Sequence, residues 1–116
     1  MKQLVRVTQS YKAFYEDPVR VAAGTRVKLT GRVDVWDGHT WLWAIAKDSR
    51  EGWIPDSLVE HTQPPEQVAL FDYSAVELSC ETGESLTRQH STHGWSWCIN
   101  AEGDMGWVPD RYLKED

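Results

Sequence analysis

Cysteine and long apolar runs are the features that this 116-residue chain has least of. Its two cysteines, Cys80 and Cys98, are too few for a disulfide framework. No stretch approaches the run of about 18 apolar residues that a membrane-spanning helix needs. The first residues also lack the apolar segment of a signal peptide. These absences predict a soluble, cytoplasmic protein with no membrane partner.

Positive charge is scarce as well. Lysine and arginine number 12 against 18 aspartates and glutamates, which gives a net charge of −6. Nucleic acids and anionic membranes bind basic surfaces, so we expect neither as a partner. The acidic residues are spread along the chain, as is typical of a solvated surface. A hydrophobic content of 41% is enough for a globular fold.

Tryptophan, by contrast, is abundant, and all but one of the 7 tryptophans belong to an internal repeat. Trp41–Trp43 followed by Gly52–Asp56 recurs, with the same internal spacing, as Trp95–Trp97 followed by Gly106–Asp110. A repeat of this kind indicates two related structural units. The polar, Pro-Pro-containing segment between them cannot continue a strand ladder. We therefore predict domains at 1–60 and 67–116, joined by a short linker at 61–66.

Short strands separated by turns account for both repeats. Arg26–Leu29 alternates apolar and polar residues, and Val68–Phe71 opens the second repeat as a strand. Lys47–Arg50 and Asn100–Asp104 have the composition of hairpin tips. No window predicts an amphipathic helix. The pattern indicates an all-β chain made of small barrels or sandwiches.

The repeated tryptophans lie on one face of a predicted hairpin. If the second repeat turns at Glu102, directly opposed residues share a face of the sheet. The pairs in the second hairpin are then Trp97 with Trp107, Trp95 with Pro109, and Cys98 with Gly106. The pairs in the first are Trp43 with Trp53, Trp41 with Pro55, and Ala44 with Gly52. The small-residue face suits a barrel interior, so the aromatic face points outward and marks an interaction site.

Four ordered motifs of the second repeat resemble the Src-homology-3 (SH3) family. They are Ala69–Tyr73, similar to the family's ALYDY opening; Glu77–Glu84, similar to ELSFxxGD; Gly94-Trp95, the groove tryptophan; and Gly106–Leu113, similar to GYIPSNYV. The resemblance covers nearly the whole chain and looks most like the variant, tandem SH3-like proteins of bacteria. It implies two tandem SH3-like β-barrels, each of about five short antiparallel strands.

The resemblance also implies a peptide-binding groove in each domain. In the second domain its residues are Phe71, Tyr73, Trp95, Pro109 and Tyr112, with Glu77 as the acid that meets a basic ligand side chain. In the first domain they are Tyr11, Trp41 and Pro55, with Asp17 near the acidic position. The outward hairpin face adds Trp107 and Trp53 as candidate binding residues. Proline-rich segments are one candidate ligand class, because their extended helix costs little ordering entropy to bind.

The two repeats depart from the family pattern in different ways. Leu78 follows Tyr73 after a loop that is shorter than the family's, so the acidic loop tip is largely missing. The first repeat keeps a loop of ordinary length but has Gln9 and Leu58 where aromatic residues are expected. It also carries a longer segment before Trp41.

Other chemistry has weaker support in the sequence. Cys80, His90, His93 and Cys98 could be a metal set or a Cys–His pair, but their spacing matches no common zinc site. Buried structural cysteines and loop histidines are the favoured interpretation. We expect no catalytic residue, metal or cofactor, and hence a non-enzymatic protein that binds a protein or peptide. The alternative is an assembly module whose aromatic faces pack between the domains or across a homodimer. The chain itself is expected to be a monomer or a weak homodimer.

Overall fold

The computed structural model describes residues 3–14 and 17–115 of the chain. Within these residues it is all-β, as the sequence predicts, with no α-helix and with two single-turn 3-10 helices, η1 (Asp56–Leu58) and η2 (Asp110–Tyr112). No helix in the described part of the chain is long and apolar enough to span a membrane.

The strands form three sheets. A five-stranded sheet has the order β10-β9-β8-β1-β11, a four-stranded sheet the order β5-β4-β3-β6, and β2 pairs with β7. The strand bounds are β1 Gln3–Val7, β2 Arg20–Val21, β3 Arg26–Trp36, β4 His39–Ile45, β5 Glu51–Pro55, β6 Glu66–Val68, β7 Tyr73–Ser74, β8 Ser85–Thr92, β9 Trp95–Ile99, β10 Met105–Pro109 and β11 Leu113–Glu115.

The chain divides into two compact units at positions that differ from the expected ones. Unit 1 combines Met1–Glu16 with Val76–Asp116, and unit 2 is the continuous segment Asp17–Ala75. The expected linker at 61–66 does not join the units, because it runs along β3 inside unit 2. There the Leu29 amide donates to the Pro65 carbonyl over 2.6 Å, and Glu66 pairs with Lys28.

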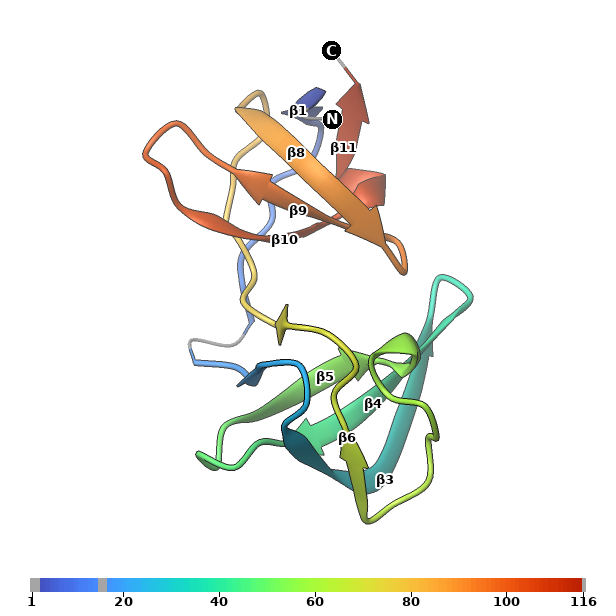
Figure 1. The fold of residues 1–116 in the computed structure, drawn as a ribbon. Helices are drawn as coiled ribbons and strands as arrows, with labels where there is room; N and C mark the ends of the chain where they lie inside the picture. Colours follow the sequence, from blue (N-terminus) through green and yellow to red (C-terminus); the bar gives the residue numbers. More distant parts are fainter. Residues whose placement is uncertain (1–2, 15–16, 116) are drawn as a thin grey trace. The chain divides into compact units, whose positions relative to one another are not determined.

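The division differs because the opening strand of each repeat pairs with the strands of the other repeat. β1 lies between β8 and β11, and β6 lies beside β3 (Figure 1). The two pairings are equivalent: the Val7 amide donates to the Glu84 carbonyl over 2.9 Å, and the Ala69 amide donates to the Thr25 carbonyl over 2.8 Å. Each opening strand therefore occupies in one unit the place that its counterpart occupies in the other.

The equivalence extends along both opening segments. In unit 1, Tyr11 forms an antiparallel bridge with Cys80, and in unit 2, Tyr73 pairs with Val21. Between β1 and Tyr11, the Thr8 amide donates a hydrogen bond of 2.7 Å to the Tyr112 carbonyl. This matches the bond of Leu70 with the carbonyl of Leu58, at 2.8 Å.

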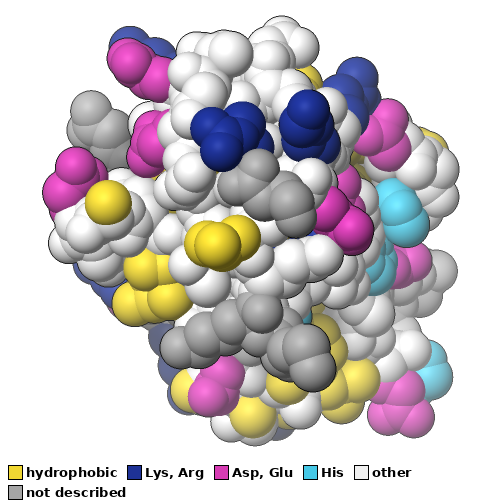
Figure 2. Space-filling model, turned by 90° about the horizontal axis from the view of Figure 1, so that it is seen from above, with side chains coloured by type: hydrophobic (Ala, Val, Ile, Leu, Met, Phe, Trp, Pro, Cys, Tyr) yellow, Lys and Arg dark blue, Asp and Glu magenta, His cyan; other side chains and the backbone are white. Residues whose placement is uncertain are grey.

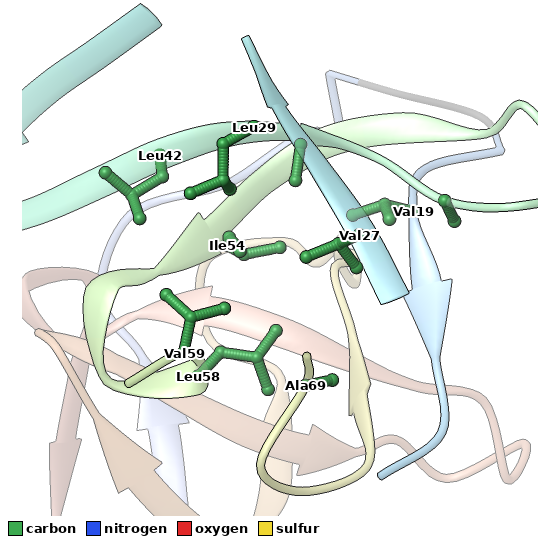
Figure 3. Close-up of a cluster of buried hydrophobic side chains, with 10 residues drawn as sticks. Val19, Val27, Leu29, Leu42, Ile54, Leu58, Val59 and Ala69 are labelled. Atoms are coloured by element: carbon green, nitrogen blue, oxygen red, sulfur yellow. The ribbon is translucent and has the colours of Figure 1, made fainter. Parts of the chain in front are cut away.

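Both cores depend on the exchanged segments. In unit 1, Val5 and Val7 of β1 are fully buried beside Leu86 and Cys98. Fully burying a side chain of this size contributes about 1.5–3 kcal/mol. Unit 2 has its own core, to which Ala69 belongs (Figure 3). Its labelled members are Val19, Val27, Leu29, Leu42, Ile54, Leu58, Val59 and Ala69.

The predicted hairpin registers are confirmed in both repeats. Trp97 lies opposite Trp107, Trp95 opposite Pro109 and Cys98 opposite Gly106. The first repeat has the corresponding pairs, Trp43 with Trp53, Trp41 with Pro55 and Ala44 with Gly52. Ala44 and Cys98 are completely buried, so the small-residue face is the interior one, as expected.

Gly106 should tolerate a side chain far less well than its counterpart Gly52. An added Cβ at Gly106 would lie 2.6 Å from the Glu77 carbonyl carbon and 2.7 Å from the Leu78 nitrogen, both backbone atoms. At Gly52 the nearest atom would be a side-chain carbon of Val19, at 3.2 Å. We predict that Gly106→Ala lowers the free energy of unfolding by about 3 kcal/mol and Gly52→Ala by about 1 kcal/mol in urea denaturation. Equal losses would contradict this backbone contact.

The exchange itself can be tested with paired cysteines. Arg6 lies opposite Ser85 in the β1–β8 ladder, and both are exposed. Directly opposed residues of antiparallel strands are close enough for a disulfide. We predict that Arg6→Cys with Ser85→Cys forms an intramolecular bond on mild oxidation, seen as a faster-migrating monomer on non-reducing gels.

The control pair reports the unexchanged arrangement. There Arg6 would take the place of Val68, which lies opposite Arg26. Arg6→Cys with Arg26→Cys should therefore stay reduced under the same conditions. Bond formation in this second pair, and not in the first, would show that β1 pairs within its own repeat.

Candidate functional site

An aromatic cluster on unit 1 is centred on Tyr11. Its ring centroid lies 5.8 Å from that of Trp95, 5.6 Å from that of Tyr112 and 6.1 Å from that of Phe14. All three contacts are edge-to-face, the arrangement that aromatic quadrupoles favour. Tyr11 is buried, Trp95 and Tyr112 are half-buried, and Phe14 is 78% exposed. The cluster thus offers several partly exposed ring surfaces above a buried tyrosine.

The exchange changes which residues share a site. The sequence predicts Phe71 and Tyr73 beside Trp95 and Tyr112, but these two residues lie in unit 2. Their place in unit 1 is taken by Gln9 and Tyr11. The expected grooves are therefore recombined: each has opening-segment residues from one repeat and hairpin residues from the other. Pro109 stays with Trp95, opposite it in the ladder, and is buried.

Glu77 is held inside this cluster. Its Oε1 accepts a hydrogen bond of 2.8 Å from the Phe14 amide. Burial raises the pKa of this half-buried carboxyl, and the Phe14 amide and the neighbouring Tyr11 hydroxyl partly offset that effect. Burial, followed by the charge of Glu77, likewise raises the pKa of Tyr11. Glu77 thus holds the segment that carries Phe14 in place within unit 1. The sequence predicted a contact of Glu77 with a ligand, but not this structural role.

The Tyr11 hydroxyl is a buried group with no hydrogen-bond partner of standard geometry among the described residues. Buried donors without acceptors are costly, and most native hydroxyls avoid that state. The corresponding hydroxyl in unit 2, that of Tyr73, donates to the Trp53 carbonyl over 3.3 Å. The two tyrosines hold equivalent places in the fold but differ in how their polar ends are satisfied.

Unit 2 carries the second recombined set. Tyr73 and Trp41 are half-buried, Phe71 is 44% exposed, and Pro55 is buried opposite Trp41 in the ladder. Leu58, which stands where a tyrosine is expected, is completely buried in the core. This set therefore has no counterpart of the Tyr112 ring.

Asp17, the acid predicted for the first groove, is occupied elsewhere. Its Oδ2 lies 3.0 Å from Arg50 Nε, and the same arginine pairs with Asp48 at 3.3 Å. Tyr15 and Glu16, which the sequence places in the same loop, lie outside the described residues. Both predicted acidic residues, Asp17 and Glu77, thus have partners within their own units.

The outward tryptophan pairs are less exposed than the sequence suggests. Trp43 and Trp53 meet edge-to-face at 5.0 Å, and the Arg32 guanidinium lies 4.8 and 4.9 Å from their ring centroids. The Trp43 indole also donates to Glu51 Oε1 over 2.6 Å. Part of the aromatic surface of this half-buried pair is therefore occupied within unit 2 by a cation–π contact.

The corresponding pair of unit 1 is covered by a histidine. Trp97 and Trp107 meet at 5.3 Å, and the His90 ring stacks on Trp97 at 6.5 Å. Trp107 is only 7% exposed, so it is a buried residue and not the groove surface that we predicted. Pro55 and Pro109, which the sequence also predicts as groove residues, are buried within their own units.

The cysteines are buried thiols in the described structure. Burial raises the pKa of Cys80 to about 11, with a further contribution from Glu84. The pKa of Cys98 is also raised to about 11 by burial, although the charge of Arg88 opposes this. Thiols of this kind are protonated at neutral pH and poorly nucleophilic. No group of three or more potential metal ligands occurs among residues 3–14 and 17–115.

Surface charge is mixed on the face that Figure 2 shows, where acidic and basic side chains are interspersed. Neither sign gathers there into one large patch. This agrees with the dispersed acidic residues of the sequence and with their interpretation as a solvated surface.

Two residues of the candidate site were not predicted from the sequence. Phe14 has no place in the motifs, and the only signal for it is an aromatic residue three positions after Tyr11. Arg32 could be found only by placing β3 beside β4 in the observed register, which shifts between Leu29 and Val33.

Comparison with known proteins gives one match. The sequence model of a family described as "Variant SH3 domain" matches residues 4–61. These residues run from β1 through η1 and so include parts of both compact units. No curated protein and no solved structure matches the chain.

The buried carboxyl of Glu77 gives a pH prediction. Because the pKa of Glu77 is raised in the fold, the folded state retains this proton where the unfolded chain releases it. Ionising Glu77 therefore costs stability as pH rises through its folded pKa, and the cost is absent below the unfolded pKa. Glu77→Gln keeps a side-chain oxygen that can accept the hydrogen bond from the Phe14 amide.

We predict that Glu77→Gln is more stable than the wild type at neutral pH, and that this advantage shrinks as the pH is lowered. Urea denaturation of both proteins across an acidic pH series measures the difference. Glu102→Gln, at an exposed hairpin tip, is the matched control and should show no such trend. A variant that loses stability equally at every pH would mean that the Glu77 charge itself is needed.

Proposed function

Because this chain belongs to the variant SH3 domain family, we propose that it is a non-enzymatic interaction module that binds extended, proline-rich peptide segments. Domains of this type are generally binding modules without catalytic activity. We further propose that units 1 and 2 are two SH3-like barrels that have exchanged their opening segments. A cytoplasmic location remains a prediction from the sequence.

The observation that carries the proposal is the ring cluster around Tyr11. Trp95 and Tyr112 are both half-buried, and each lies within 6 Å of the Tyr11 centroid, so one buried tyrosine supports two partly exposed rings. A polyproline II segment presents proline rings at regular intervals, and adjacent flat aromatic surfaces can receive them. Phe14 extends this surface, because it is exposed and in edge contact with Tyr11.

The polar groups at the cluster do not favour a charged ligand. The Glu77 carboxylate accepts the Phe14 amide, so it is already engaged in positioning a groove residue. The Tyr11 hydroxyl is buried beside the Glu77 carboxyl, so it too is engaged within unit 1. Affinity in this proposal comes from ring contacts more than from an ion pair.

Unit 1 is the principal binding site in this proposal. Unit 2 has Leu58 in place of the Tyr112 ring, and its Tyr73 hydroxyl already donates to Trp53. The alternative function, assembly through the outward aromatic faces, has less support. Part of the surface of the Trp43–Trp53 pair is already occupied by Arg32 of the same unit.

Titration of a proline-rich peptide panel, followed by tryptophan fluorescence and calorimetry, tests the proposal. We predict that Trp95→Ala weakens binding by about 30-fold or more, the loss typical of a central aromatic residue. Trp41→Ala, the same change at the equivalent position of unit 2, should weaken it much less. Phe14→Ala should fall between them.

Equal binding by wild type and Trp95→Ala would exclude the unit 1 groove. A larger loss in Trp41→Ala than in Trp95→Ala would assign the site to unit 2 instead. Circular dichroism of each variant separates a binding defect from unfolding.

A further inference from the structure

The outer part of β3 is an edge strand. On one side β3 pairs with β6 only over Arg26–Lys28. The linker continues this contact as far as Leu29, whose amide bonds the Pro65 carbonyl at 2.6 Å. From Val33 onward the strand pairs with β4 alone, and no other described strand pairs with it. Its outer edge therefore resembles the template that sheets use to add a further strand.

Two valines make this edge apolar. Val33 and Val35 are 54% and 64% exposed. Val33 lies opposite Leu42, a core residue of unit 2, so the valines continue the core face of the sheet beyond the end of the core. Exposed β-branched residues on one face of an edge strand favour pairing with another strand.

The backbone groups of the same residues are directed outward. In an antiparallel pair, hydrogen-bonded and non-hydrogen-bonded positions alternate along the strand. The Val35 amide donates to the Asp34 carboxylate, at 3.0 Å, and not to β4. By alternation, the amide and carbonyl of Val33 also point toward the open edge. Val33 is thus a position from which a second strand can be bonded.

The charges on this strand are complementary to themselves. Arg32 and Asp34 flank Val33, and both are exposed. In the single chain the Arg32 guanidinium lies over Trp43 and Trp53 and the Asp34 carboxylate accepts a hydrogen bond from the Val35 amide, so pairing redirects both side chains. In an antiparallel pair of two such strands centred on Val33, Arg32 of each copy lies opposite Asp34 of the other. The two valines at the centre then lie opposite one another, and each Val35 lies diagonal to a Val33 of the other copy. Such a two-fold pairing uses one surface patch twice and closes on itself.

We propose that two copies of this chain associate through the outer edge of β3, as an antiparallel strand pair centred on Val33. The partner is a second copy because the edge is self-complementary: in the antiparallel pair each Arg32 lies opposite an Asp34 of the other copy. The interface is short, since the register of β3 shifts between Leu29 and Val33, and the association is correspondingly weak. This inference does not depend on the proposed peptide binding.

A charge-swap experiment tests the pairing. Sedimentation equilibrium of the wild type over a wide concentration range should show a reversible monomer–dimer equilibrium. Arg32→Asp places two aspartates opposite each other in each of the two symmetric pairs, and Asp34→Arg places two arginines there. We expect each single variant to weaken the dimer by about tenfold or more. The double variant should restore association to within about threefold of the wild type.

Matched reversals elsewhere control for net charge. Lys12→Asp changes the charge as Arg32→Asp does, and Glu102→Arg as Asp34→Arg does; both residues are exposed and lie outside β3. Neither should alter the dimer. Because Arg32 also covers Trp43 and Trp53, the thermal unfolding midpoint of each variant is measured to show that unit 2 stays folded.

A wild type that is monomeric at every concentration would overturn the proposal. So would a dimer that the single reversals leave unchanged, or one that the double variant fails to restore while remaining folded. If the Lys12→Asp and Glu102→Arg controls also lost association, the dimer would depend on net charge and not on the β3 edge.

Discussion

The backbone pairing of each opening strand with the other repeat is the constraint on which the rest of the structure depends. β1 supplies buried valines to the core of unit 1, and the segment after β6 supplies Ala69 to the core of unit 2. Neither repeat by itself contains all the strands of a compact unit. The two pairings use equivalent residues and equivalent backbone hydrogen bonds. The exchange determines which repeat contributes each strand.

That constraint also determines the character of the two aromatic surfaces. Tyr11 joins Trp95 and Tyr112 because it belongs to the segment that enters unit 1, while Phe71 and Tyr73 enter unit 2. The unit that receives Tyr11 has three rings in contact with it, those of Phe14, Trp95 and Tyr112. The other has an exposed phenylalanine but no ring at Leu58. Arg32 and His90 contact the tryptophan pairs on the adjacent strands, whereas the Tyr11 cluster includes the 78% exposed Phe14.

Local patterns in the sequence predicted what depends on local pairing. The registers Trp97–Trp107 and Trp43–Trp53 follow from one hairpin turn and the alternation of side chains, and both are confirmed. The domain boundaries were predicted differently, because the pattern of each opening strand does not specify which repeat it pairs with. One signal was available: the short loop from Tyr73 to Leu78. Short hinge loops favour exchange, since they cannot fold back without strain. The contact of Phe14 with Tyr11 lies within one segment, but no motif predicted it.

The interleaving of the two units has a consequence for how the repeats can diverge. Unit 2 is continuous in sequence, whereas unit 1 is assembled from both ends of the chain. A substitution at Val7 changes the packing around Leu86 and Cys98. A substitution at Ala69 changes the packing of core residues of the first repeat. Losing either repeat would remove strands from both compact units. The two halves are therefore bound to a shared evolutionary history, and each must accommodate the mutations of the other.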